Sequence, residues 1–382
     1  MNGIFPGKVG LQQRVLAAYR VPFFEQLGTK CSDGLEIFAG EPRPEEHIVT
    51  GGRMDVATHI EARNVHVGRG GFYFCWQRGY RRWLKRFNPD VLIVAADPRI
   101  VSTYLAIRYM HSRGRPVIGW GLGTLTQRPS RMSVASGLRS KLYRSYDAVV
   151  AYSSKAAEDY SRVGVPDDRI FVAQNAASME SANAAAVRYP ADGEEVRKWR
   201  ASHGLTRPTI IFVGRLIPQK RLDLLIESCR VTANDFDLLV VGDGPERKNL
   251  EQLAADRFPN IRFIGHQQGE ELSLAFAASD LFVLPGTGGL AIHEAMAHRK
   301  PVIVGVGDGT EVDLVQDGRN GLLLPHVDLG SLTKAIQGYI GNPERLRKEG
   351  IESRKIVEEE ANIEKMTSTF VSALRLVSGL DS

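Results

Sequence analysis

The sequence predicts an α/β fold with two Rossmann-like, doubly wound parallel-sheet domains that face a cleft. Three observations carry this prediction: a length of 382 residues, short runs rich in Val and Ile along the whole chain, and a helical stretch after nearly every run. At about 100–200 residues per domain, this length favours two domains. Continuous apolar runs without alternation indicate strands that are buried on both faces, as in a parallel sheet.

The first domain is expected to span residues 1–178. Each of its apolar runs is followed by a helical stretch, and this alternation predicts right-handed βαβ units. The expected strands are Val9–Val15, Leu35–Ala39, Val91–Ala95, Val117–Trp120, Ala148–Tyr152 and Ile170–Val172.

The second domain repeats the same alternation over residues 208–362. Its expected strands are Thr209–Gly214, Leu238–Gly242, Ile261–Gly265, Leu281–Leu284, Pro301–Val304 and Leu322–Leu324. Between the two domains, the polar segment 179–207 is predicted to be a linker. The last helix, at about 363–382, has no strand after it, and we expect it to pack back on the first domain.

Composition restricts the class of protein. With 43% apolar and 24% charged residues, the chain has an ordinary globular composition. Its three cysteines, Cys31, Cys75 and Cys229, are widely spaced and match no zinc motif, which fits a reducing compartment. The sequence shows neither a run of about 18 apolar residues nor a secretory signal, so we expect a cytoplasmic protein. Peripheral contact with the inner membrane face is a further hypothesis.

Charge is distributed unevenly along the chain. Residues 1–180 contain 25 basic and 16 acidic residues, whereas the remainder contains 24 basic and 28 acidic ones. Within residues 78–86, cations alternate with aromatic residues in a helix-like stretch. This stretch is either a solvated helix face or a docking surface for an anionic membrane or a phosphorylated acceptor. The sequence carries no nucleic-acid-binding motif, so we do not expect nucleic acid as a partner.

A pair of cations follows the first strand of the second domain. Arg215 and Lys220 lie five residues apart in GRLIPQKR, just past the carboxyl end of the strand, where doubly wound sheets bind ligands. A guanidinium group can hold phosphate oxygens in a bidentate way, and an ammonium group adds a compact charge. The pair therefore predicts a phosphate site; a solvated loop before a helix is the alternative.

Two glycine-rich turns follow later strands of the same domain. Gly242 and Gly244, in VGDGPER, would permit close approach of the backbone to a ligand, although a purely structural turn is the alternative. In LPGTGGLAIHEAMA a strand ends, glycines follow, and a helix begins, so that free amides and the helix dipole favour an anion. Glu294, about one turn into this helix, could accept hydrogen bonds from two ribose hydroxyls; otherwise it is an exposed helical glutamate.

These runs together resemble the GT-B glycosyltransferases of family 4. The similarity covers GRLIPQKRLDLLIES, VVGDGPER, IRFIGH, GLAIHEAMAHRKPVIV and DGRNGLLLP, and more loosely VGLQQRVLAAYRVPFFEQL, PVIGWGLG, DAVVAYSSKAAEDY and VAQNAAS. The resemblance implies a retaining enzyme that moves a hexose-type sugar from a UDP- or GDP-sugar without a metal or another cofactor. The acceptor would be a lipid-linked saccharide, a polysaccharide or another hydroxyl. A nucleotide-sugar epimerase and a catalytically silent nucleotide-sugar-binding relative are the alternatives.

The resemblance also assigns residues. Arg215 and Lys220 match the catalytic pair on the donor's diphosphate, and Glu294 matches the glutamate that holds the ribose. The full set of expected donor contacts is Gly214, Gly242, Gly244, Gly265, His266, Gly288, Gly289, Leu290, Ala291 and Glu294.

Three positions depart from the family pattern. The family's first glutamate falls at Gly286, and a histidine of the first domain falls near Leu122. After the first strand, paired glycines are replaced by a segment that ends in Arg20. The expected acceptor or sugar contacts of the first domain are Arg20, Asp97, Gly121, Leu122 and Gly123, with helix capping as the alternative for Asp97.

Overall fold

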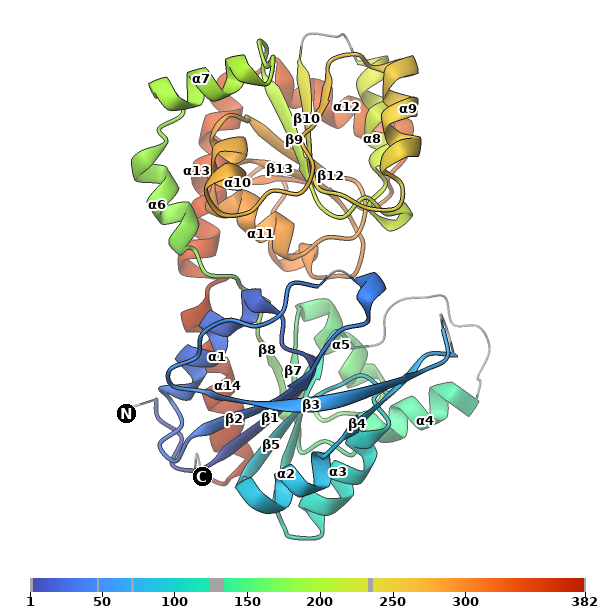
Figure 1. Cartoon of the computed structure of the whole chain (residues 1–382), viewed down its shortest axis with the longest axis vertical. Coiled ribbons are helices and arrows are strands. Elements are labelled where there is room, and N and C mark those ends of the chain that lie inside the picture. Colours follow the sequence, from blue (N-terminus) through green and yellow to red (C-terminus); the bar gives the residue numbers. More distant parts are fainter. Residues whose placement is uncertain (1–2, 47, 70–71, 124–133, 233–235, 381–382) are drawn as a thin grey trace. The chain divides into compact units, whose positions relative to one another are not determined.

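The chain folds into two compact units, each built around one β-sheet (Figure 1). The computed structural model describes residues 3–46, 48–69, 72–123, 134–232 and 236–380. The first unit comprises Met1–Ala177 together with Ile363–Ser382, and the second comprises Ser178–Asn362. Both units confirm the predicted doubly wound α/β class.

The sheet of the first unit has the strand order β4-β3-β2-β1-β5-β6-β7-β8. All of its strand pairs are parallel except β3 with β4. The strands are β1 (Val9–Val15), β2 (Leu35–Gly40), β3 (Thr58–Val67), β4 (Phe74–Arg78), β5 (Val91–Ala95), β6 (Val117–Gly121), β7 (Ala148–Ala151) and β8 (Ile170–Val172). Because β2 and β5 both flank β1, the direction of winding reverses at β1.

The antiparallel pair β3 and β4 was not predicted from the sequence. Exposed and buried residues alternate strictly along β4, and Ala62 is the one fully buried residue of β3. These strands lie at the edge of the sheet, where one face stays open to solvent, so their sequences lack the continuous apolar run of a central strand. The first sheet is therefore mixed, with a parallel centre and an antiparallel edge.

Helices cover both faces of this sheet (Figure 1). One hydrophobic core involves α1 (Val21–Gly28) and the last helix, α14 (Ile363–Val377), which lies against α1, β7 and β8. A second core involves α2 (Tyr80–Phe87), α3 (Ser102–His111), α4 (Val134–Tyr143) and α5 (Ser154–Arg162). Successive strand residues alternate between the cores: Ile93 contributes to the first, whereas Leu92 and Val94 contribute to the second.

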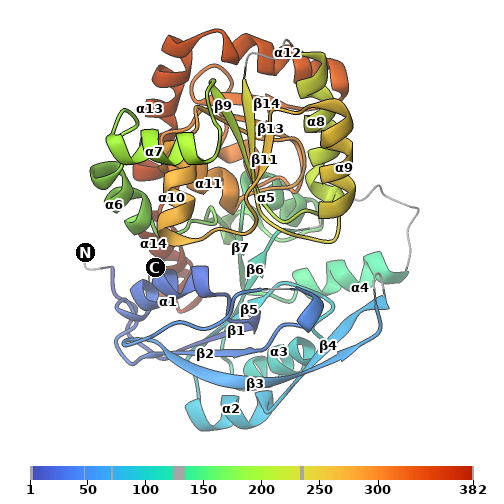
Figure 2. The same cartoon turned by 45° about the horizontal axis from the view of Figure 1, so that its top comes forward.

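The sheet of the second unit is parallel throughout, with the order β11-β10-β9-β12-β13-β14. Figure 2 labels β9, β11, β13 and β14 of this sheet. Its strands are β9 (Thr209–Val213), β10 (Asp237–Val241), β11 (Ile261–Phe263), β12 (Leu281–Leu284), β13 (Val302–Gly305) and β14 (Gly321–Leu324). Each matches a predicted strand within two residues. The direction of winding reverses between β9 and β12, and ligands of open α/β sheets bind outside the carboxyl ends of strands at such a point.

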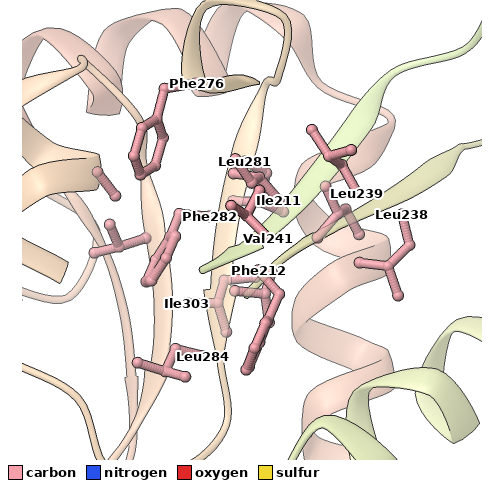
Figure 3. Packing of buried hydrophobic residues seen from close by; sticks show 14 of the residues in the cluster. Ile211, Phe212, Leu238, Leu239, Val241, Phe276, Leu281, Phe282, Leu284 and Ile303 are labelled. Carbon is pink, nitrogen blue, oxygen red and sulfur yellow. The ribbon is translucent and has the colours of Figure 1, made fainter. Parts of the chain in front are cut away.

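Two helix layers enclose the second sheet. One contains α8 (Leu222–Val231), α9 (Arg247–Arg257) and α12 (Leu329–Ile340), and the other contains α10 (Gly269–Ala277), α11 (Leu290–Ala297) and α13 (Pro343–Glu359). Figure 3 shows Phe212, Phe282 and Leu284 among the packed side chains of the strands. This continuous core fixes the loops at the ends of β9 and β12.

Segment 179–207, predicted as a linker, is folded onto the second unit instead. It forms α6 (Glu180–Arg188) and α7 (Glu194–Ser202), and both helices contact α10. Ala182, Val196 and Trp199 are buried in the core of this unit. The apolar residues of this polar segment are small and widely spaced, so its two helices were not recognised from the sequence. Among the described helices of the chain, none has the length and apolarity that a membrane span requires.

Candidate active site

Two loops of the second unit meet at the point where the winding reverses. The first follows β9 and contains a short 3₁₀ helix, Pro218–Lys220, and the second follows β12 and leads into α11. The Thr287 amide donates to the Gln219 carbonyl at 3.1 Å, and the Lys220 Nζ donates to the Thr287 carbonyl. The structure thus brings the predicted cation next to the predicted glycine-rich turn.

The environment of Lys220 differs from that of Arg215. Burial lowers the pKa of the half-buried Lys220 ammonium group, and the nearby Asp308 carboxylate opposes this shift. Arg215 lies on the same loop with an exposed side chain. The loop therefore presents one partly buried positive charge, at Lys220, and one solvent-exposed positive charge, at Arg215.

Glycines let the loops after β9 and β10 approach each other closely. Gly242 has a φ of +141°, and a Cβ atom there would lie 1.9 Å from the Gly214 carbonyl oxygen. At Gly244 a Cβ atom would lie 2.4 Å from the Leu216 carbonyl oxygen, and the Leu216 amide donates to the Asp243 carbonyl at 2.9 Å. These glycines are needed for packing between the loops, whether or not their backbone also contacts a ligand.

The same reasoning explains the departure at Gly286. A Cβ atom at this position would lie 2.0 Å from the Gln219 carbonyl oxygen and 2.8 Å from the Lys220 Cα. The loop after β9 therefore occupies the space that any side chain at position 286 would need. A glutamate could enter only if this loop, together with Lys220, moved.

Helix α11 begins at this turn with free amides. Its N-terminal neighbour Gly289 has a φ of +122° and provides no side-chain cap, so the first amides of the helix, at Leu290 and Ala291, have no acceptor within the helix. Gly288 packs against Leu284, where a Cβ atom would approach to 2.2 Å. The turn thus presents backbone donors at the positive end of the helix dipole.

Glu294 lies one turn further along α11 and is half-buried. Burial raises the pKa of its carboxyl group. Among the residues that the structure describes, none forms a hydrogen bond or an ion pair with this carboxylate. A partly buried carboxylate without partners is costly, and a ligand with hydroxyl donors would satisfy it.

The loop after β13 was not predicted from the sequence. The Asp308 carboxylate accepts from the Thr310 amide at 3.1 Å and from its hydroxyl at 2.6 Å, and it interacts electrostatically with Lys220. Glu311 is fully buried and accepts from the Gly307 amide at 2.7 Å. The Gly-Asp-Gly-Thr sequence at residues 307–310, one residue past the end of a strand, was the available signal for this loop.

The remaining predicted donor residues lie at the end of β11. Gly265 accepts from the Gly242 amide at 2.8 Å, which joins the loops after β10 and β11. His266 is exposed, and its ring contacts the Gln268 side chain. No set of three or more His, Cys, Asp or Glu side chains with metal-binding geometry occurs within the described ranges.

The predicted residues of the first unit lie at the carboxyl ends of β1, β5 and β6. Asp97 binds the guanidinium group of Arg99, with Oδ2 accepting from Nη2 at 2.8 Å. Gly121 packs near the Tyr160 hydroxyl, Leu122 is half-buried, and Gly123 accepts from the Tyr143 hydroxyl at 3.2 Å. Arg20 is buried among aromatic rings. These residues thus belong to a second set, in the other unit from Lys220 and Glu294.

Two protein families match the chain. Residues 195–356 match the glycosyl transferases group 1, and residues 35–180 match the glycosyltransferase family 4. The first match lies within the second unit and includes Arg215, Lys220 and Glu294. The second covers most of the first unit, and only its last three residues, 178–180, belong to the second unit.

Curated relatives match parts of the chain. A GDP-mannose-dependent alpha-mannosyltransferase of Corynebacterium glutamicum is 40% identical over 34% of this chain and 30% of its own length. A protein of the same description from Mycobacterium tuberculosis is 29% identical over 64% of this chain and 62% of its own length. A GDP-mannose-dependent phosphatidylinositol monomannoside mannosyltransferase of Mycolicibacterium smegmatis is 29% identical over 44% and 48%. The chain therefore spans less than two thirds of the length of each.

Solved structures match nearly the whole chain at low identity. The HepE protein of Anabaena, in complex with UDP, is 16% identical with a TM-score of 0.73, over 97% of this chain and 99% of its own. Sucrose-phosphate synthase from Thermosynechococcus elongatus is 17% identical with a TM-score of 0.73, over the same shares. At this identity the likeness shows a common fold.

Proposed function

The chain belongs to the group 1 and family 4 glycosyltransferases with the GT-B fold, and on this premise we propose that it transfers a hexose-type sugar from a nucleotide-diphosphate sugar to a hydroxyl acceptor, with retention of configuration. One observation carries the proposal: the Lys220 ammonium group is bound to Thr287, in the turn that opens α11. The Lys220 cation and the free amides at the start of α11 thereby occur at two joined loops, and Glu294, which has no partner among the described residues, follows in the same helix.

The donor's diphosphate is the group that these loops suit. When the bond from the sugar C1 to the phosphate oxygen breaks, negative charge grows on the leaving diphosphate. Lys220, Arg215 and the first amides of α11 can stabilise that charge, and such donors are most effective where water is excluded. We propose that these two cations make a resident metal unnecessary, so that dialysis against EDTA leaves the activity unchanged.

Glu294 is assigned to the ribose. Its half-buried carboxylate has no partner among the described residues and could accept hydrogen bonds from two ribose hydroxyls. Gly265 and His266, at the end of β11, are assigned to the nucleotide base. Because several relatives are described as GDP-mannose-dependent, we propose GDP-mannose as the donor. A UDP-sugar is the alternative.

The acceptor is assigned to the first unit, as a lipid-linked saccharide or a growing polysaccharide at an anionic membrane surface. On α2 the aromatic residues Tyr80 and Trp83 are buried, whereas Arg81, Arg82 and Lys85 are exposed. This arrangement supplies a cationic helix face, which would attract anionic lipids. Flotation with vesicles that contain phosphatidylglycerol tests this contact; equal binding to neutral vesicles would contradict it.

The donor assignment can be tested without knowledge of the acceptor. Thermal unfolding is measured with GDP, UDP, ADP and their common sugar conjugates, for the natural chain and for Arg215→Ala and Lys220→Ala. A ligand at about 100 times its Kd adds roughly 2.7 kcal/mol to the free energy of unfolding. We expect GDP and GDP-mannose to stabilise the natural chain and to lose most of this effect in both variants.

Matched controls and turnover separate the remaining alternatives. Arg230→Ala removes an exposed arginine of α8 whose side chain pairs with Glu227, and this variant should respond like the natural chain. Stabilisation by none of the nucleotides would overturn the donor site. A catalytically silent relative would bind the nucleotide sugar but never release the nucleotide from it. An epimerase would convert the nucleotide sugar into its epimer without any acceptor.

A further inference from the structure

We propose that the first unit contains an oxyanion site at Arg20, which binds a phosphate group of the acceptor. The assignment of the phosphate to the acceptor rests on the proposed function. The binding of an anion at Arg20 is inferred from the first unit alone.

Arg20 occupies the position at which ligands bind in an open α/β sheet. It ends the 3₁₀ helix Ala18–Arg20, directly after β1, and the winding of the first sheet reverses at β1. Its side chain reaches Trp120, next to the last residue of β6, and Tyr152, the first residue after β7. The guanidinium group therefore lies at the carboxyl ends of the strands on one side of the reversal.

Aromatic groups enclose this guanidinium group. Its Cζ lies 4.3 Å from the ring centre of Trp120, 5.4 Å from that of Tyr152 and 5.3 Å from that of Tyr19. Nη2 donates to the Tyr152 hydroxyl at 2.9 Å, and Nε donates to the Tyr19 hydroxyl at 3.0 Å. Only 8% of Arg20 is exposed. The rings hold the cation in place but supply no negative charge.

Other arginines at this end of the sheet have carboxylate partners. Arg14 binds Glu46 at 2.8 Å, Arg43 binds the same carboxylate at 3.3 Å, and Arg99 binds Asp97 at 2.8 Å. Arg20, which is more buried than any of these, forms no ion pair with the acidic residues that the structure describes. A buried charge without a counter-ion is strongly unfavourable, so a bound anion would remove a cost that the ligand-free protein carries.

One nitrogen of Arg20 has no acceptor. Nη1 is buried and forms no hydrogen bond within the described part of the chain. Of the enclosing rings, Trp120 is 1% exposed, whereas Tyr19 is 40% exposed, so Tyr19 is the ring that an incoming ligand could displace. An oxyanion that displaces the Tyr19 ring would reach Nη1 and the second hydrogen of Nη2. Terminal phosphate oxygens match this pair of donors.

Inorganic phosphate is the probe for this site. The double variant Arg215→Ala/Lys220→Ala serves as background, because it removes the phosphate-binding cations of the second unit. Thermal unfolding is followed against phosphate concentration at constant ionic strength, with and without Arg20→Gln. Since hydrogen bonds to a charged group contribute about 1.5–3 kcal/mol, we expect Arg20→Gln to weaken phosphate binding about tenfold or more.

Three further variants keep the test decisive. Arg53→Gln removes an arginine of the same unit that is 87% exposed, and it should leave the phosphate response unchanged. Arg20→Lys retains the charge and should retain part of the response. Tyr19→Phe leaves Arg20 in place and removes the hydroxyl bound to Nε, so phosphate should bind at least as tightly. An undiminished response in Arg20→Gln, or a tenfold loss in Tyr19→Phe, would overturn the proposal.

A second titration identifies the source of the phosphate. Nucleotide diphosphate is titrated into the Arg20→Gln variant with Arg215 and Lys220 intact. Unchanged nucleotide affinity, together with lost phosphate affinity in the double-variant background, supports a phosphate on the acceptor. A tenfold loss of nucleotide affinity would assign Arg20 to the donor and overturn the acceptor assignment. Failure of the donor proposal, by contrast, would leave the phosphate response of Arg20 unaffected.

Discussion

The two units form their candidate sites from different parts of the chain: main-chain atoms in the second unit and side chains in the first. In the second unit the contacts are between main-chain atoms: Gly242, Gly244 and Gly286 leave no room for a Cβ atom, and the loops after β9, β10, β11 and β12 join through main-chain hydrogen bonds. In the first unit, side chains that are far apart in the sequence meet, as when Arg20 reaches Tyr152. A site of the first kind tolerates almost no added volume, whereas a site of the second kind depends on polar groups that satisfy one another.

The largest expected effect is a loss of kcat when Lys220, the half-buried cation of the candidate site in the second unit, is replaced. Lys220→Ala removes the ammonium group that is bound to the Thr287 carbonyl. Removal of one preorganised donor at a developing charge costs about 10²–10³ in kcat. We therefore expect kcat for donor cleavage to fall by about two to three orders of magnitude, measured as nucleotide release from the sugar donor. Arg230→Ala is the control, and a tenfold or smaller loss in Lys220→Ala would show that the cation is not central to the chemistry.

The next effect concerns volume at the joined loops. In Gly286→Ala the new methyl group would lie 2.0 Å from the Gln219 carbonyl oxygen, so the loop that carries Lys220 must move. Overpacking costs about 1–3 kcal/mol and occasionally more, and we expect a loss at the upper end because the obstacle is backbone. Denaturant unfolding measures the loss, and nucleotide binding should fall with it.

Gly341→Ala is the matched control for this substitution. Gly341 follows α12 with a φ of −81° and has no atom within 4 Å of the position that a Cβ would take. Its replacement should change the free energy of unfolding by less than about 0.5 kcal/mol. Equal stability of the two variants would mean that the loops after β9 and β12 do not pack as tightly as described.

The contrast between the units also explains what the sequence could predict. Central strands such as β5 and β12 were predicted because burial on both faces demands a continuous apolar run. Lys220 and Glu294 were predicted as donor contacts because they lie beside glycine-rich turns at strand ends, and the structure places Lys220 next to the turn that precedes α11; their contact with a donor stays a prediction. The edge strand β4 alternates exposed and buried residues, and its neighbour β3 has only one fully buried residue, so neither has a continuous apolar run. The contact of Arg20 with Tyr152 joins residues 132 positions apart, which local patterns could not reveal.

A third prediction concerns the side-chain network of the first unit. Gln77 is buried on β4; its Nε2 donates to the Gln13 carbonyl and to Asn64 Oδ1, both at 3.0 Å, and its Oε1 accepts from Gln12. Gln77→Leu would leave these buried groups without partners, at about 1–3 kcal/mol. Denaturant unfolding should show this loss. Gln26→Leu, at a surface position whose amide makes only a 3.5 Å contact, should stay within about 0.5 kcal/mol of the natural chain, and an equal loss there would contradict the network.

The smallest expected effect distinguishes binding from stability within the second unit. Burial raises the pKa of the Glu294 carboxyl group, so the folded chain holds this proton more tightly than the unfolded chain does. The contribution of Glu294 to stability therefore falls as the pH rises from the ordinary glutamate pKa of about 4.3 through the raised value. Glu294→Gln removes the charge, and its unfolding temperature should exceed that of the natural chain by about 2 °C at pH 7, with a smaller difference at pH 5.

The same variant should bind nucleotide less well although it is no less stable. Loss of a charged acceptor for the ribose hydroxyls would cost about 1.5–3 kcal/mol, or roughly tenfold or more in affinity. Thermal unfolding with and without nucleotide, at pH 5 and pH 7, measures both quantities in one experiment. A lower unfolding temperature at both pH values would show that Glu294 supports the fold. A higher temperature with weakened nucleotide binding would show that the second unit retains an unfavourable carboxylate for the sake of its ligand.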